Sequence, residues 1–421
     1  MTYEFEYLMH LLSCGVKGTA PEPPRQPVDY DRLIQLAQDQ SVLPLIGIAL
    51  SNDHNIGFPC EKAQALVART RSLAFTNYVK KNLIMKLLKD FEEAGIQAVL
   101  LKGYALADLY AEPNCRISSD VDIYIDIKDE KRSYKLLKEH GCKVNPRPPL
   151  SHHSKCEHSQ MGHIELHVIL YDEIAEKIWF DKMNDRQFIK EPFEEHKTDN
   201  GTYLTLGITD NLIYITLHMI KHFVRSGTSL RQMMDIALYL KNYHTQIDTK
   251  RFWDILESLK YRKLINTVLS AMIIYCNLSP EDFIGYAKAD KEAISGLLAD
   301  LETGGWLGKN EVEERKGSWY RYNRIRYTEK RSSFFYWCYM IRRNAIFYIH
   351  VIFPARDSLE KKYPYVKKTA CFLPAAWIHR MLRGIWKLFH GKMDTGIISR
   401  KEQISIDEKG RDYLFKLMNM M

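Results

Sequence analysis

The chain has 421 residues, of which 46% are hydrophobic and 27% charged. This composition indicates a globular protein of two or three domains and excludes a disordered or low-complexity chain. The eight cysteines include no Cys-x-x-Cys pair, which argues against a zinc ribbon or a disulfide scaffold. The net charge is +8. The N-terminus does not show the basic segment followed by an apolar segment that marks a signal peptide, and no apolar run approaches the ~20 residues of a membrane-spanning helix. We therefore expect the protein to be cytoplasmic.

Residues 1–95 are predicted to form an N-terminal helical region. A segment that begins at Asp29 opens with acidic residues and continues with apolar residues at helical spacing. Residues 61–93 form a long amphipathic pattern that ends at Gly95, a suitable residue after a helix C-terminus. We expect the apolar face of this helix to cover the sheet that follows.

Residues 96–200 are predicted to form an α/β core. Short apolar runs alternate with helical patterns, and a Gln160-Met161-Gly162 turn separates two alternating segments. The expected helices are 104–111 and 129–140. The expected strands, which form a small mixed sheet, are 96–101, 121–126, 142–145, 152–158 and 163–170.

Two acidic residues alternate with apolar residues at the start of the second predicted strand. Asp120 and Asp122 therefore lie on one face of a strand, with Val121 and Ile123 on the other. Two like charges on one face are unfavourable in a dry core, but a divalent cation between them removes the repulsion. Their oxygen donors suit Mg²⁺. The alternative for an isolated Asp-x-Asp is an exposed edge strand with two solvated acids.

A Lys102-Gly103 pair lies at the end of the first predicted strand. Strand, glycine turn and helix N-terminus together form a phosphate site, to which Lys102 adds a positive charge. Arg116 lies four residues before Asp120. Its guanidinium could contact a phosphate or pair with an acidic side chain, and the sequence leaves both open.

These motifs together resemble the uncharacterised nucleotidyltransferase family of the polymerase-beta superfamily. The resemblance lies in Leu100-Leu101-Lys102-Gly103, in Arg116 through Asp122, and in the strand Ile164-Glu165-Leu166-His167. It continues into residues 217–237 and covers roughly residues 30–390. The turn differs from the Gly-Ser or Gly-Gly of the wider superfamily.

The resemblance implies an α+β fold with a small mixed sheet between helical regions, and nucleotidyl transfer from a nucleoside triphosphate to an unknown acceptor hydroxyl. It implies that Asp120, Asp122 and Glu165 hold Mg²⁺, or Mn²⁺ in its place, and are the catalytic residues. Lys102, Gly103, Arg116 and His167 are then the predicted nucleotide-binding residues.

Four other histidines, His152, His153, His158 and His163, lie near this strand in the sequence. Their spacing matches no established zinc pattern, so we expect His167 to line the nucleotide pocket and the others to lie on the hairpin surface. In the following helical domain, residues 201–305, His218 and His222 lie on one helix face, where we expect packing against the site.

The C-terminal region, residues 306–421, is basic and aromatic. Between Lys316 and Lys392 there are 17 lysines and arginines and three acidic residues, which leaves the rest of the chain net acidic. The segments 321–327 and 375–389 interleave cations with apolar or aromatic residues. Three roles are open for these segments. They could form amphipathic helices whose lysine and arginine side chains cover the core of the same subdomain. They could also form a surface that binds a membrane or an acidic partner, or one that binds nucleic acid.

Three other functions stay open at this point. The fold could be retained by a catalytically silent protein that binds a nucleotide or a partner. Asp-x-Asp also occurs in metal-dependent glycosyltransferases that use sugar nucleotides, although no Rossmann-like half precedes the motif here. An interaction protein that works through the basic C-terminal region is the third.

Overall fold

The computed structural model describes residues 1–51, 59–147, 152–170, 190–199, 201–225, 227–304, 359, 363, 365, 372–379 and 413–420. The chain divides into two compact units, Met1–Trp319 with Arg411–Met421, and Tyr320–Gly410. The predicted boundaries at residues 95, 200 and 305 stay a prediction.

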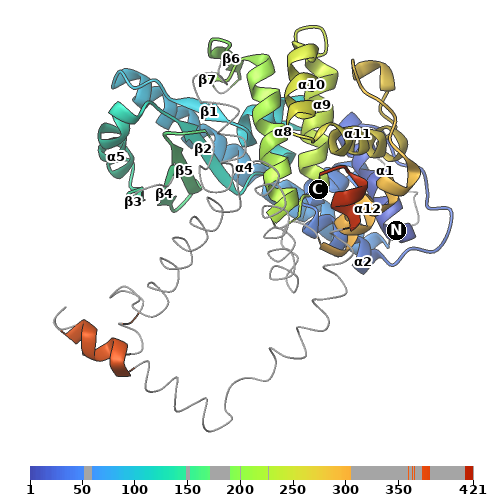
Figure 1. Ribbon diagram of the computed structural model, residues 1–421. Helices are drawn as coiled ribbons and strands as arrows, with labels where there is room; N and C mark the ends of the chain where they lie inside the picture. Colours follow the sequence, from blue (N-terminus) through green and yellow to red (C-terminus); the bar gives the residue numbers. More distant parts are fainter. Residues whose placement is uncertain are drawn as a thin grey trace. The chain divides into compact units, whose positions relative to one another are not determined.

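The described part of the first unit contains a seven-stranded mixed sheet (Figure 1). Its strand order is β3-β4-β5-β2-β1-β7-β6. Strand β2 pairs antiparallel with β1 and parallel with β5, and β4 and β5 form an antiparallel hairpin. The strands are β1 (Val99–Leu101), β2 (Asp120–Tyr124), β3 (Lys143–Asn145), β4 (His153–His158), β5 (Gly162–His167), β6 (Glu194–Thr198) and β7 (Gly201–Thr205).

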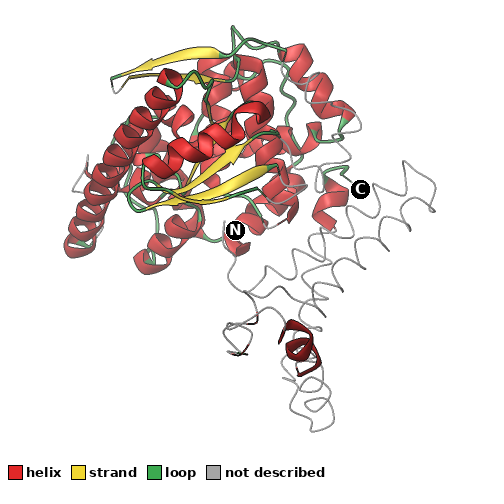
Figure 2. Cartoon of the chain, turned by 90° about the vertical axis from the view of Figure 1, so that its left-hand side faces the viewer, coloured by secondary structure: helices red, strands yellow, loops and turns green. Residues whose placement is uncertain are grey.

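Helices precede and follow the strands in sequence and surround them in Figure 2. Those before or within the sheet region are α1 (Tyr3–Lys17), α2 (Tyr30–Asp39), α3 (Leu43–Ser51), α4 (Cys60–Glu93) and α5 (Glu130–Glu139). Those after it are α8 (Ile208–Arg225), α9 (Leu230–Tyr243), α10 (Thr249–Ser258), α11 (Arg262–Cys276) and α12 (Lys291–Gly304). The predicted α+β class, with a mixed sheet between helical regions, is confirmed.

The two faces of the central strands differ in chemistry. Val121 and Ile123 of β2 are buried with Ile164 of β5 in a core that also contains Ile84 and Phe91 of α4. Helix α4 therefore covers the apolar face, as its amphipathic pattern predicted. Because side chains alternate along a strand, the acidic residues of β2 and β5 are directed to the opposite face.

The start of α2 and the end of α4 are both capped, and the cap at Gly95 was predicted. The Asp29 side chain accepts hydrogen bonds from the backbone N–H groups of Asp31 and Arg32 at the start of α2. After α4, Gly95 has a φ of 67°, and Ile96 N–H donates to the Phe91 carbonyl at 2.9 Å. This left-handed conformation costs glycine little, which explains why the helix ends there.

Two elements differ from the prediction. Residues 104–111 were expected to form an α-helix, but the chain forms the 3-10 helix η1 (Gly103–Leu109). Its first turn closes from Ala105 N–H to the Lys102 carbonyl at 2.7 Å. The hairpin β6–β7 was not predicted, and its parallel pairing with β1 through β7 extends the sheet.

No helix in the described residues is long and apolar enough to span a membrane. Most of the two basic segments, 321–327 and 375–389, lies outside the described residues. In the second unit the described residues include a small buried cluster, Leu359, Tyr363 and Ala376.

Candidate active site

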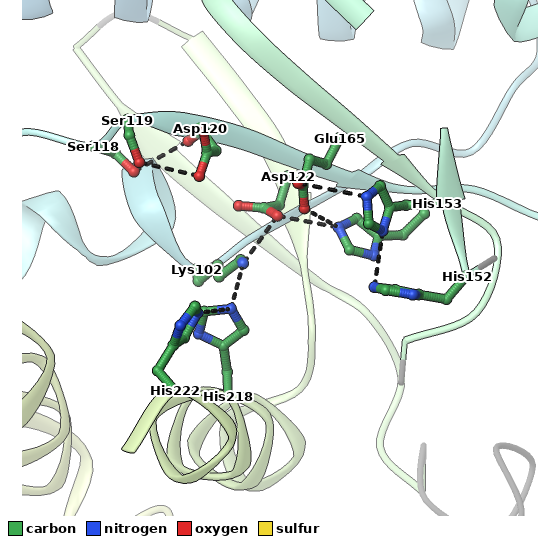
Figure 3. Close-up of polar contacts among 11 residues, drawn as sticks. Lys102, Ser118, Ser119, Asp120, Asp122, His152, His153, Glu165, His218 and His222 are labelled. Atoms are coloured by element: carbon green, nitrogen blue, oxygen red, sulfur yellow. Dashed lines mark hydrogen bonds and ion pairs between the residues drawn. The ribbon is translucent and has the colours of Figure 1, made fainter. Parts of the chain in front are cut away.

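The predicted acidic residues come together on one face of the sheet. Asp122 of β2 and Glu165 of β5 are direct partners across the parallel pair, and Asp120 is two residues earlier on the same face. Asp122 is buried, with 3% of its surface exposed, whereas Asp120 and Glu165 are partly exposed. Figure 3 shows the three carboxylates along the two strands.

Asp122 is held by two positively polarised neighbours. Its Oδ1 lies 3.0 Å from Lys102 Nζ and 3.1 Å from His167 Nε2 (Figure 3). Burial raises the pKa of the Asp122 carboxyl, but Lys102 and His167 outweigh burial, and the pKa is lowered overall. Asp122 is therefore ionised at neutral pH.

The other two carboxyls differ in proton affinity. Burial and hydrogen bonding act in opposite directions on Glu165, and its contacts with His167 and His153 lower its pKa overall. Asp120 accepts a hydrogen bond from Ser119 Oγ at 3.0 Å. Its pKa is raised, first by burial and then by the charge of Asp122. A cation at this face relieves that repulsion.

Lys102 and Gly103 form a sharp corner beside these acids. Lys102 has a φ of 32° and Gly103 a φ of 39°. A Cβ atom on Gly103 would lie 3.1 Å from Ser118 Oγ. Both the positive φ of Gly103 and its close approach to Ser118 therefore favour glycine at position 103.

Helix α8 supplies the second partner of Lys102. Lys102 Nζ lies 2.7 Å from His218 Nε2, which in turn lies 3.2 Å from His222 Nε2 (Figure 3). Burial lowers the pKa of His218 well below its usual value, and the charge of Lys102 lowers it further. A neutral His218 can therefore accept a hydrogen bond from the Lys102 ammonium. The expected packing of this histidine face against the site is observed.

Arg116 is directed to α9. Its Nε and Nη2 donate to the two carboxylate oxygens of Asp235 at 3.1 and 2.6 Å. The Tyr110 hydroxyl donates to the same carboxylate at 2.7 Å. Of the two roles that the sequence left open, the structure shows the ion pair. Arg116 also lines the pocket described next, and its contact with a phosphate stays a prediction.

A pocket opens between the sheet and the two helices that follow it. Its lining from the sheet side and its loops comprises Lys102, Gly103, Leu106, Arg116, Ser118, Ser119, Asp120 and Asp122. Its lining from α8 and α9 comprises Ile215, His218, Arg231, Gln232 and Asp235. Glu165 and His167 lie next to Asp122 but outside this lining.

The pocket contains polar residues that the sequence did not single out as site residues. Ser118 and Ser119 directly precede the Asp-x-Asp motif, so their position was a usable signal. Gln232 had no such signal, because a single glutamine on a helix has no distinguishing pattern.

Two histidines were predicted wrongly. His152 and His153 do not lie on the hairpin surface but pack against His167, with ring centroids 5.4 and 5.2 Å from the His167 ring. Burial lowers the pKa of His152 to about 2 and that of His153 to about 4. Both imidazoles are therefore neutral at pH 7. The difference arises because His152 and His153 lie around the start of β4, opposite His167 at the end of β5, whereas the hairpin turn follows His158.

This chain is similar to a known protein family and to a solved structure. The model of a family described as uncharacterised nucleotidyltransferase matches residues 26–273. The chain is similar to the crystal structure of an antigenic nucleotidyltransferase-like protein from Paracoccidioides brasiliensis, with 15% sequence identity and a TM-score of 0.29. The match covers 51% of this chain and 95% of the Paracoccidioides chain. No curated protein matches the sequence. The family match spans more than half of the chain, and the protein therefore belongs to the uncharacterised nucleotidyltransferase family.

Proposed function

We propose that this protein transfers a nucleoside monophosphate from a nucleoside triphosphate to an acceptor hydroxyl in a reaction that depends on Mg²⁺ or Mn²⁺. The observation that carries the proposal is the register of β2 and β5, which sets Asp122 beside Glu165 on the face that carries Asp120. Lys102 reaches the same point from the neighbouring strand. Family membership supports the same reaction class.

The donor set fits a hard divalent cation. Asp122, Glu165 and His167 place ligand atoms within 4.8 Å of one another, and Asp120 adds a further carboxylate on the same face. Asp120, Asp122 and Glu165 would hold the ion through oxygen, as Mg²⁺ prefers. When bound, such an ion neutralises charge on the phosphates and on the leaving group.

The chain's own residues supply binding and proton transfer. Lys102 would contact a phosphate, and the hydroxyl groups of Ser118 and Ser119 line the pocket beside it. The acceptor oxygen forms a bond to the α-phosphorus while the bond to the bridging oxygen of the β-phosphate breaks, and pyrophosphate leaves with the electron pair. The hydroxyl proton passes to the carboxylate of Glu165, which lies directly beside Asp122 across the β2–β5 pair.

The first test needs no knowledge of the acceptor. We expect at least one of the four common nucleoside triphosphates, with Mg²⁺, to raise the thermal unfolding temperature of the full-length protein. A ligand at 100 times its Kd stabilises the folded state by about 2.7 kcal/mol. Transfer is then measured as release of pyrophosphate and as incorporation of label from an α-phosphate-labelled nucleotide. If none of the four binds with Mg²⁺ or Mn²⁺, the proposal is wrong.

The same assays separate the alternatives. A catalytically silent protein binds the nucleotide but releases no pyrophosphate with any class of hydroxyl acceptor. A glycosyltransferase is stabilised by a sugar nucleotide and releases a nucleoside diphosphate.

Replacing Lys102 with Met tests the phosphate contact. A hydrogen bond to a charged group contributes about 1.5–3 kcal/mol, so we expect the affinity for the triphosphate to fall roughly 10- to 100-fold. Affinity for Mg²⁺ without nucleotide should not fall, because the variant removes a cation from Asp122. Both affinities are measured by calorimetry. Lys128→Met is the control, since Lys128 is exposed beyond the end of β2, and equal effects of the two variants would contradict the assignment.

A further inference from the structure

Three histidines meet at the end of the hairpin next to the acidic residues. His153 of β4 and His167 of β5 are direct partners across the antiparallel pair. His152 precedes β4, and its carbonyl accepts a hydrogen bond from Val168 N–H at 3.1 Å. Backbone pairing therefore holds all three in position. The rings of His152 and His153 lie with their centroids 4.2 Å apart (Figure 3).

The outer nitrogens of two of these rings contact carboxylates. His153 Nε2 lies 3.5 Å from Glu165 Oε1, and His167 Nε2 lies 3.1 Å from Asp122 Oδ1. Metal-binding histidines have this arrangement, in which a carboxylate accepts from one ring nitrogen and directs the other toward the ion. The two acids therefore orient His153 and His167.

The second ring nitrogens of His153 and His167 do not face these carboxylates. His153 Nδ1 lies 2.8 Å from His152 Nε2. His167 is 3% exposed, and its Nδ1 is buried with no hydrogen-bond partner in the part of the chain that the structure describes. A buried polar atom without a partner costs about 1–3 kcal/mol. One ring nitrogen from each of the three histidines lies within 4.8 Å of the other two.

We propose that His152, His153 and His167 form a second metal site, which takes a borderline transition-metal cation, Zn²⁺ in the first place. The ligands are His152 Nε2, His153 Nδ1 and His167 Nδ1. Three imidazole nitrogens suit Zn²⁺ and similar ions, whereas Mg²⁺ prefers oxygen. Three protein ligands leave a fourth position for water or a ligand.

The two sites are connected through the histidines. A cation on the inner nitrogens makes the outer N–H groups better donors, which strengthens their hydrogen bonds to Asp122 and Glu165. Zn²⁺ at the histidine site therefore orients two of the three carboxylates without occupying their site.

The test measures metal binding alone, without nucleotide. Full-length protein freed of metal by chelation is titrated with Zn²⁺ by calorimetry in excess Mg²⁺, and Co²⁺ replaces Zn²⁺ for visible absorption. We expect one Zn²⁺ per chain that Mg²⁺ does not displace, and a Co²⁺ spectrum typical of four or five ligands. His152→Ala should weaken Zn²⁺ binding by at least about 10-fold, because even the loss of a residue that only hydrogen-bonds to a metal ligand typically lowers the affinity by about 10-fold or more.

Two controls separate this site from the acidic one. His163→Ala changes an exposed histidine on β5, the strand that carries His167, and it should leave the Zn²⁺ affinity unchanged. Asp120→Asn removes a carboxylate from the acidic site and should also leave it unchanged. His153→Gln is the second variant if circular dichroism shows that His152→Ala is unfolded.

Three results would overturn the proposal: no Zn²⁺ bound, Zn²⁺ displaced by Mg²⁺, or binding lost in Asp120→Asn but kept in His152→Ala. Because the measurements involve no triphosphate, failure of nucleotidyl transfer would not affect them. If the protein transfers a nucleotide but binds no Zn²⁺ in the titration, the proposed function is supported and this metal site is contradicted.

Discussion

Replacing Asp122 with Asn should reduce nucleotidyl transfer by at least about 100-fold, the scale observed when a group that stabilises transition-state charge is removed. Asn has the same shape as Asp but no charge, so it cannot neutralise a divalent cation. Asp122 is the carboxylate at which the contacts of Lys102 and His167 converge. Initial rates of pyrophosphate release with the nucleotide that stabilises the protein check this result.

Asp126→Asn is the matched control. Asp126 follows β2 in sequence, its side chain is 51% exposed, and its carboxylate caps η3 (Ile127–Asp129) by accepting from Lys128 N–H. Because Asn also caps helices well, this variant should keep both stability and transfer rate. Thermal unfolding distinguishes loss of function from loss of fold in both variants. A transfer rate within two-fold of the unchanged protein in Asp122→Asn would remove Asp122 from the metal site.

Replacing Arg116 with Met should destabilise the fold by about 3–5 kcal/mol, the typical cost of leaving one partner of a buried ion pair without its counter-charge. Arg116 and Asp235 have side chains that are 3% and 6% exposed. The pair joins the segment before β2 to α9, two parts of the chain that are far apart in sequence. Urea unfolding at equilibrium measures the loss.

Lys89→Met is the comparison for this second effect. Lys89 pairs with Glu93 at 3.7 Å, and the two side chains are 72% and 64% exposed. Solvent screens such a pair, so its loss should cost less than about 1 kcal/mol. The double variant Arg116→Met, Asp235→Leu should recover part of the lost stability, because it removes both buried charges. Equal costs for Arg116→Met and Lys89→Met would show that the buried pair does not hold α9 to the sheet region.

Local periodicity was enough to predict the central strands and their two faces. Val121 and Ile123 alternate with Asp120 and Asp122, and the same alternation in Ile164-Glu165-Leu166-His167 was visible in the sequence. The motifs also identified the family that the comparison shows. The β6–β7 hairpin could not be predicted in this way. Glu194-Glu195-His196-Lys197-Thr198 has no apolar alternation, and β6 is an edge strand held by backbone pairing.

The sequence by itself determined which face of β2 and of β5 is acidic, because the alternation of side chains between the two faces of a strand depends on the backbone alone. Tertiary structure decided the partners. Arg116 pairs with a residue 119 positions away, Lys102 contacts a histidine 116 positions away, and His152 and His153 turn inward against His167. Such contacts depend on strand order and on how α8 and α9 pack over the sheet, and no local pattern of residues encodes that distance.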